Sequence, residues 1–419
     1  MAAFPEDFEI DISRLIMLWV AEGFLKPCNK FKCLEDVGKV YLEDLVNRNL
    51  ILVSKKGPDG KLVAVGIHDL LRKICITKAE EEGFLHHFSS KTNVCHDAIE
   101  NPKRRLGAHC TETFQELHTQ DSSLRSIFSE RGLFSQLSLK FRRLRILNSP
   151  KVTWWNLPVV ISTFVNLRYI SVSLDDNMPC LNEFLASLSK LPNLETIITD
   201  VTYCEGLQVP NEILRMPKLR HLIMSHPRCL SDPSVIGIIN TSDLRTLERV
   251  IGFFFTEDVI KILVNLKKLT VVVDHYGDNW DDLNLDNVFH LQNLEELRVS
   301  RDIKVLEIVD NDINRESEWT TIEDQFLRLK YFCSSLDYWV KWEVEKEHLP
   351  SLESLILVYV KLIDAISSGI GEIDSLQLIE LQDCRGSLVN SARRIQEQQH
   401  ENGNVAFQVN VVEYVYTND

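Results

Sequence analysis

Groups of three apolar residues at three-residue spacing recur from residue 141 almost to the end of the chain. Their middle members are 22 to 28 residues apart, except for one step of 35. These intervals lie in or just beside the period of leucine-rich repeats, roughly 20–29 residues. The triplets are Phe141, Leu144, Leu147; Phe164, Leu167, Ile170; Leu191, Leu194, Ile197; Met216, Leu219, Leu222; Thr241, Leu244, Leu247; Leu263, Leu266, Leu269; Leu291, Leu294, Leu297; Phe326, Leu329, Phe332; Leu349, Leu352, Leu355; and Ile373, Leu376, Ile379.

Burial explains such a repeat, because one unit cannot cover its own apolar face but stacked units can. The pattern predicts an α/β leucine-rich-repeat solenoid, curved, with a parallel sheet on its concave face. Side chains between the leucines would point off that sheet. Such a broad and rigid surface suits the binding of a macromolecule. The partner-binding candidates are Tyr169, His221, Arg298 and Tyr331 on this face and Trp280 in a loop.

Composition narrows the class of protein. The chain has 419 residues, of which 44% are hydrophobic and 26% charged, as expected of a folded protein. Its formal net charge of −15 argues against a dedicated nucleic-acid-binding protein, which would show a basic face. The ten cysteines are scattered, with no C-x-x-C pair and no histidine at zinc-like spacing. We therefore expect reduced thiols and no metal site.

The sequence predicts a location inside the cell. The opening MAAFPEDFEI lacks the basic segment and apolar run of a signal peptide. No apolar stretch approaches the roughly 20 residues that a membrane-spanning helix needs. We expect the cytoplasm, with peripheral association at membranes as the alternative.

Residues 1–83 follow the order helix, helix, hairpin, helix. Asp11 can cap the first helix, and a second amphipathic helix covers residues 34–50. Two apolar stretches flank the turn at residues 57–60, and Asp69 can cap the third helix. This order predicts a small, mainly α winged-helix domain. Acidic residues on the second helix argue against DNA binding by it.

The rest of the chain divides into three parts. The mixed, polar residues 84–103 are interpreted as a linker, and residues 104–390 as leucine-rich repeats. Residues 391–419 contain a polar loop and an alternating strand, which is typical of a C-terminal cap.

Chemical motifs are scarce. The loop 274–286 is rich in aspartate and could resemble a calcium site, but it lacks the ordered ligand spacing of one. A solvated loop or a contact with a partner is the better interpretation. Since no Ser-His-Asp or Cys-His pattern has supporting context, we predict no catalytic residue and no enzyme.

The first ninety residues resemble a known family. The segments FPEDFEI, RLIMLWVAEGFL, YLEDLVNRNLILV and IHDLLRKICI occur in order and precede leucine-rich repeats. They are similar to the end of the nucleotide-binding module in plant intracellular nucleotide-binding leucine-rich-repeat disease resistance proteins of the coiled-coil class. The sequences of these segments are most similar to those of late blight resistance protein homologues of the nightshade family. The sequence contains no G-x-x-x-x-G-K-[ST] phosphate loop, so it resembles a truncated member without the coiled coil and ATPase core.

The resemblance gives roles to two groups of residues. His68 and Asp69 match the family's Met-His-Asp motif, whose histidine contacts bound ADP; in this chain they would act only within an intact receptor. Without that context, Asp69 is an N-cap and His68 a loop residue. Arg104, Arg105, Arg142 and Arg143 would form an autoinhibitory dock between the repeats and the nucleotide-binding module. The competing interpretation is a solvated charged face.

The resemblance also implies a function. The repeats would recognise a pathogen effector or a guarded host protein and restrain an ADP/ATP-dependent switch that leads to the hypersensitive response of innate immunity. This chain would need no cofactor itself. The alternative is a leucine-rich-repeat adaptor or decoy for protein–protein interaction without a nucleotide switch.

Overall fold

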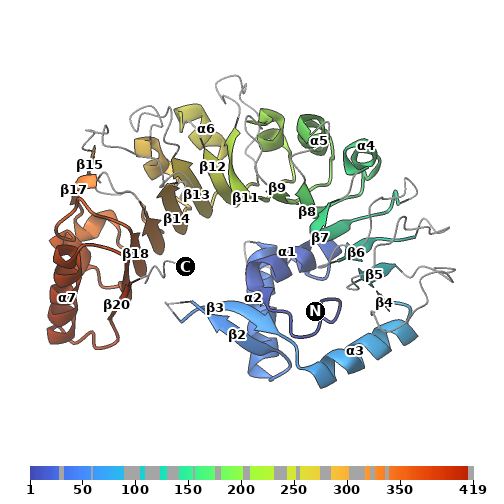
Figure 1. The fold of residues 1–419 in the computed structure, drawn as a ribbon, viewed down its shortest axis with the longest axis horizontal. Helices are drawn as coiled ribbons and strands as arrows, with labels where there is room; N and C mark the ends of the chain where they lie inside the picture. The colour runs from blue at the N-terminus through green and yellow to red at the C-terminus, as the bar shows by residue number, and fades with distance from the viewer. Residues whose placement is uncertain are drawn as a thin grey trace, which may run out of the picture. The chain divides into compact units, whose positions relative to one another are not determined.

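A computed structural model gives the fold, and its described residues group into two compact units, Met1–His226 and Pro227–Asp419 (Figure 1). The structure describes residues 1–27, 33–57, 60–88, 104–108, 123–129, 141–153, 156–174, 181–201, 208–230, 243–251, 255–273, 285–301, 317–320, 326–335 and 339–413. The first unit contains the winged-helix domain together with the first repeats, so the predicted boundary at residue 83 lies inside this unit.

The winged-helix domain has the predicted order of elements and one additional strand. Its elements are β1 (Ile10–Asp11), α1 (Ile12–Glu22), α2 (Leu34–Asn47), β2 (Leu52–Lys56), β3 (Leu62–Gly66) and α3 (Asp69–Glu81). The hairpin of β2 and β3 is antiparallel, and the short β1 pairs with β3 on its other side. This three-stranded sheet contacts α1 through β1 and β3, and α1 in turn packs on α2.

Local interactions fix the ends of the helices. The Asp11 carboxylate accepts a hydrogen bond from the Arg14 amide at 2.8 Å, which satisfies one of the unpaired donors at the start of α1. Gly23 ends α1 in the left-handed region at φ +78°, where glycine is favoured. The N-cap of α3 lies one residue before the predicted Asp69. His68 is the cap, since its Nδ1 accepts from the Leu70 amide at 3.3 Å, and Asp69 is the first helical residue.

The repeats of the first unit form a parallel sheet with helical segments on one face (Figure 1). Its strands and helical segments are β4 (His86–Phe88), β5 (Arg105–Ala108), β6 (Ser126–Phe128), β7 (Ile146–Thr153), α4 (Leu157–Val160), η1 (Ile161–Thr163), β8 (Tyr169–Leu174), α5 (Leu181–Leu188), β9 (Thr196–Val201), β10 (Gln208–Val209), η2 (Asn211–Arg215) and β11 (His221–Leu230). The strand β4 lies inside the segment predicted as a linker and pairs with β5, so the sheet begins before residue 104. We call the face opposite the helical segments the concave face, after the prediction.

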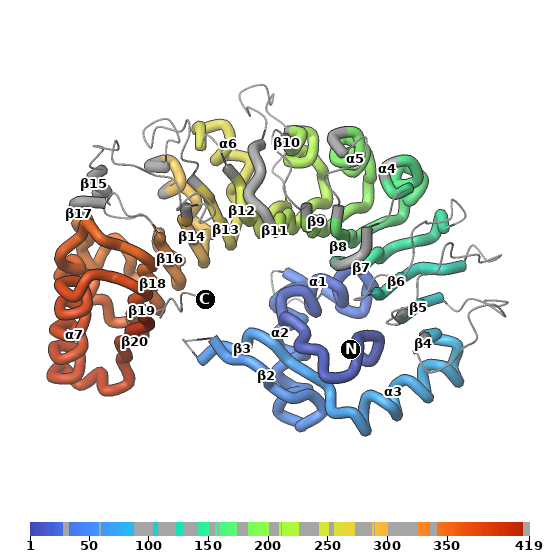
Figure 2. The backbone as a smooth tube through the Cα atoms, viewed as in Figure 1, coloured from blue at the N-terminus to red at the C-terminus, as the bar shows by residue number. Residues whose placement is uncertain are grey.

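The second unit continues the same kind of repeat, as the tube trace shows (Figure 2). Its elements are β12 (Thr246–Ile251), α6 (Glu257–Ile262), β13 (Lys268–Val273), η4 (Leu285–His290), β14 (Glu296–Arg301), β15 (Ser317–Thr320), β16 (Tyr331–Ser334), β17 (Trp339–Glu343), η6 (Lys346–His348), β18 (Ser354–Val358), η7 (Ser368–Glu372), β19 (Leu378–Gln382), α7 (Gly386–Glu401) and β20 (Gln408–Val412). The predicted cap supplies a further parallel strand, because β20 pairs with β19. Within the described residues, no helix combines the length and apolarity needed to cross a membrane.

The triplets form the core of both units. Every described member is buried, with at most 3% of its surface exposed, and only Thr241 lies outside the described residues. The parallel register aligns equivalent triplet residues, for example Ile170 with Ile197 and Leu269 with Leu297. The predicted solenoid of stacked strands is therefore confirmed.

Hydrogen bonds between turns of neighbouring repeats add to this core. The Asn166 side-chain amide donates to the Arg142 carbonyl at 2.9 Å, and Asn193 donates to the Val165 carbonyl at 3.0 Å. Asn293 makes the equivalent bond in the second unit. Each bond satisfies a turn carbonyl that the strands leave unpaired.

The contact between α1 and α2 is close enough to give a test of the packing. An added Cβ at Gly38 of α2 would lie 2.7 Å from the Ile16 side chain of α1. We expect Gly38→Ala to lower the free energy of unfolding by about 1–3 kcal/mol, because overpacking outweighs the gain in helix propensity. Urea denaturation would measure the change.

Gly386→Ala is the matched control. Gly386 also lies in a helix, and an added Cβ there meets no atom within 4 Å. This substitution should leave stability unchanged or raise it by up to about 1 kcal/mol. Equal effects of the two substitutions would contradict the close packing of α1 on α2.

Candidate functional site

The winged-helix domain covers the concave face of the first repeats. Residues of α1 form one apolar cluster with side chains from β6, β7 and β8, among them Phe128, Ile146 and Tyr169. Phe4 joins this cluster by contact with Phe128, at 6.3 Å between ring centroids. Since Tyr169 is fully buried here, part of the predicted binding surface is occupied by the chain's own domain.

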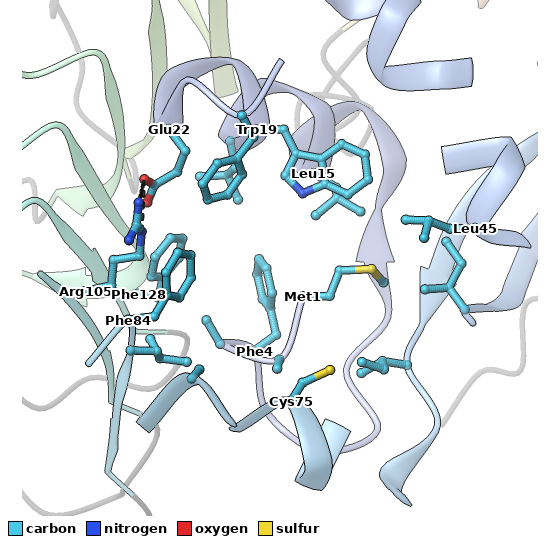
Figure 3. A pocket seen from close by; sticks show the side chains of 18 of the residues that line it. Met1, Phe4, Leu15, Trp19, Glu22, Leu45, Cys75, Phe84, Arg105 and Phe128 are labelled. Atoms are coloured by element: carbon cyan, nitrogen blue, oxygen red, sulfur yellow. Dashed lines mark hydrogen bonds and ion pairs between the residues drawn. The ribbon is translucent and has the colours of Figure 1, made fainter. Parts of the chain in front are cut away.

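One buried ion pair connects the end of α1 to the first strands. Glu22 accepts hydrogen bonds from Arg105 Nη2 at 2.8 Å and Nε at 3.1 Å, and from the Ser126 hydroxyl at 2.6 Å. The Arg105 guanidinium also lies over the Phe84 ring at 4.0 Å and the Phe24 ring at 5.4 Å. Figure 3 shows the pair at one wall of a cavity. The carboxylate and the guanidinium thus each offset the free-energy cost of burying the other's charge.

A second ionic cluster joins α2 to β11. Glu35 accepts from Arg220 Nη2 at 2.7 Å and lies 3.2 Å from His221 Nε2. A carboxylate only accepts, so this imidazole nitrogen carries the proton. Between the two clusters, Arg14 Nη2 donates to the Asn148 side chain of β7 at 2.8 Å. We call these three contacts, centred on Glu22, Arg14 and Glu35, the dock.

The electrostatics of the dock favour an ionised Glu35. Burial raises its pKa, but the hydrogen bond from His221 and the positive charges of Arg220 and His221 outweigh burial and lower the pKa to about 2. Nearby, burial raises the pKa of Glu195, and Arg168 and Arg220 offset only part of this effect. The two carboxylates therefore respond differently to acid.

A cavity of about 400 Å³ lies beside the dock (Figure 3). Its walls are apolar side chains of the winged-helix domain and first strands, including Phe4, Leu15, Trp19 and Phe128. The charged wall is the Glu22–Arg105 pair, whose hydrogen-bonding groups are directed at each other. The part of the lining that the structure describes is thus predominantly apolar.

Some of the predicted site residues lie in the contact with the winged-helix domain, and others are exposed. Tyr169 and His221 do not lie on a free surface, since Tyr169 packs in the cluster with α1 and His221 lies against Glu35 of α2. Their contact with a partner stays a prediction. The alternation of side chains gave their direction correctly but not what covers them. Of the four arginines of the predicted autoinhibitory dock, Arg105 contacts the winged-helix domain through Glu22, and Arg104, Arg142 and Arg143 are exposed.

The second unit keeps two of the candidates together. The Arg298 guanidinium lies 4.5 Å from the centroid of the Tyr331 ring and donates to Glu296 at 2.9 Å. The Arg298 side chain is 41% exposed. Burial raises the pKa of Tyr331, so its hydroxyl remains neutral. Trp280 and almost all of the acidic loop lie outside the described residues.

His68 and Asp69 are both exposed at the start of α3. Because Nδ1 of His68 accepts from the Leu70 amide, Nε2 carries the proton of the neutral ring and can act as a donor.

Sequence reasoning missed the carboxylates of the dock. Glu22 and Glu35 lie on amphipathic helices, and their partners are 83 to 186 residues away along the chain. The only available signal was that Glu22 is the one acidic residue of the mainly apolar α1.

A leucine-rich-repeat protein with an N-terminal winged-helix domain is the class that this fold defines. Residues 3–75 match the family described as the disease resistance protein winged helix domain. Two late blight resistance protein homologues of Solanum demissum are each 30% identical over 98% of this chain. A third homologue from the same plant is 28% identical over the same share. A leucine-rich-repeat protein of Leptospira interrogans aligns with 73% of this chain and 78% of its own, at 14% identity and a TM-score of 0.47.

The chain is thus similar to plant nucleotide-binding leucine-rich-repeat resistance proteins, as its motifs predicted. It spans 36% and 37% of the length of the first two homologues, and 60% of the length of the third.

Substitution of Glu22 tests the dock. We expect Glu22→Ala to lower the free energy of unfolding of the first unit by roughly 3–5 kcal/mol, because Arg105 would be left buried without its carboxylate. Hydrogen exchange should show increased exchange in α1 and β5 together. The control Asp44→Ala removes an exposed ion pair with Arg48 and should cost about 0–1 kcal/mol. A similar loss in both variants would contradict a specific dock.

The low pKa of Glu35 predicts a dependence on pH. A carboxyl whose pKa is lowered on folding stabilises the fold above its ordinary value of 4.5, and this contribution is lost as the pH falls towards 2. Its size is roughly 3 kcal/mol. The unmodified chain should therefore lose about that much more stability than Glu35→Gln between pH 5 and pH 2, measured by urea denaturation.

Glu43→Gln is the control for this comparison, since Glu43 is exposed on the same helix. It should follow the unmodified chain across this pH range. Parallel curves for the unmodified chain and Glu35→Gln would refute the assigned role of Glu35.

Proposed function

We propose that this chain is a non-enzymatic recognition protein of plant disease resistance. The observation that carries the proposal is the winged-helix domain held on the concave face of the first repeats by buried carboxylates. In this arrangement the first repeats restrain the winged-helix domain, and a partner that favours the released state would shift the population towards it. The names of the relatives support the disease resistance role.

The partner in this proposal is a protein, either a pathogen effector or a host protein that it targets. Arg298 and Tyr331 of the second unit would contact it. An arginine stacked on a tyrosine is a residue pair of the kind that dominates binding energy at interfaces, and both side chains are partly exposed.

The proposed nucleotide contact requires a second module. His68 would donate from Nε2 to a phosphate of ADP presented by a nucleotide-binding module, with Asp69 fixing the start of α3. The chain itself would hydrolyse nothing and hold no cofactor, and we place it in the cytoplasm. The second candidate is an adaptor or decoy. The partly exposed pair of Arg298 and Tyr331 favours it, since that surface can bind a protein without any nucleotide switch.

Co-precipitation tests this proposal. The full chain should bind the nucleotide-binding module of a plant resistance receptor, expressed separately, and bind it more tightly with ADP. His68→Ala should reduce the ADP-dependent part about tenfold or more, through loss of a hydrogen bond to a charged group. His290→Ala removes an exposed histidine from η4 and should have no effect.

Two results would count against the nucleotide switch. No association with or without ADP would favour the adaptor or decoy. Release of phosphate from ATP and magnesium by the chain alone would contradict the non-enzymatic assignment.

A further inference from the structure

Arginines that the dock does not use stack at one edge of the first unit. Each of Arg104, Arg125, Arg145 and Arg168 is the residue before a parallel strand. Their backbones are directly hydrogen-bonded, since the Arg125 amide donates to the Arg104 carbonyl at 2.8 Å and the Arg145 amide to the Arg125 carbonyl at 2.6 Å. Consecutive rungs of such a ladder are about 4.8 Å apart. We call Arg104, Arg125 and Arg145, with Arg143 beside them, the arginine ladder.

The ladder lacks the charge pairing seen at the same position in other repeats. Arg168 lies 3.7 Å from Glu195, the next rung. Further repeats pair Lys267 with Glu295 at 2.9 Å and Lys330 with Glu353 at 2.7 Å. Across the described residues, by contrast, no member of the arginine ladder forms an ion pair with a carboxylate.

Mutual repulsion within the ladder is visible at Arg125. Burial and then the charges of Arg145 and Arg104 lower the pKa of its guanidinium, and Arg105 and Arg143 add to the effect. Like charges at this spacing raise the free energy of the folded chain unless an anion lies between them. The cluster is also positively charged in a chain whose formal net charge is −15.

The spacing and the overall charge select among anions. Guanidinium groups bind phosphate oxygens in pairs, and neighbouring rungs can share a compact ligand with several phosphates. Acidic side chains on one face of an extended peptide recur about every 6.8 Å, which is out of register with the rungs. A membrane or duplex would extend over acidic surface as well, where the negative net charge repels it.

We propose that the arginine ladder is a binding site for a compact soluble polyphosphate. The site is separate from the partner surface and from the nucleotide contact proposed above, and it does not depend on either. Its occupation would neutralise the first repeats next to the dock residue Arg105.

Calorimetry on the full chain with inorganic tripolyphosphate tests the site. We expect one tripolyphosphate per chain and a loss of affinity of about tenfold or more in Arg125→Gln/Arg145→Gln, since two charged contacts are removed. The matched control Arg393→Gln/Arg394→Gln removes two exposed arginines from α7 and should change affinity less than about twofold. If the first variant does not fold, Arg104→Gln/Arg143→Gln removes two exposed members of the ladder instead and should also weaken binding about tenfold.

Four outcomes would overturn the proposal. They are no binding of tripolyphosphate up to about 1 mM, an equal loss in ladder and control variants, binding of polyglutamate as tight as that of tripolyphosphate, and binding only to vesicles that contain phosphoinositides. The third result would identify an acidic protein as the ligand, and the fourth a lipid surface.

Discussion

Burial of two carboxylates at the contact between the winged-helix domain and the first repeats determines how this part of the chain is arranged. Apolar packing of α1 on β7 and β8 supplies the buried contact area. Apolar surfaces alone, however, would permit the domain to dock on the strands in many registers. A buried glutamate without a partner costs several kcal/mol, so Glu22 and Glu35 admit only the register that places Arg105 and Arg220 against them.

This arrangement has a consequence for recognition. The concave face of the first repeats is covered by the chain's own domain, with Tyr169 and His221 inside the contact. Arg298 of the second unit stays partly exposed. The same kind of repeat thus has covered side chains on its strands in the first unit and a partly exposed arginine in the second. Release of the domain would break both the apolar cluster and these buried polar contacts, and protonation of Glu35 is expected to weaken one of the polar contacts.

The sequence predicted the features that depend on local pattern. The triplets identified the buried positions because a leucine every few residues has one physical use in a stacked repeat. Asp11 and Gly23 were sufficient to bound α1. The dock was beyond such reasoning, since Glu22 and Arg105 are 83 residues apart and meet only after the sheet has formed. The burial of Tyr169 shows the same limit: alternation assigns a side chain to a face, and only tertiary structure shows whether the face is covered.

A solenoid multiplies whatever residue its repeat places at one position. Leucine at the triplet positions gives a continuous core, and asparagine at the turns gives hydrogen bonds from one repeat to the next. At the position before each strand, alternating signs give ion pairs such as Lys330 with Glu353, whereas three arginines in succession give concentrated positive charge. Parallel pairing enforces this proximity, so the chain cannot disperse the charge without breaking the sheet. A compact anion between the guanidinium groups, as proposed above, would offset this repulsion.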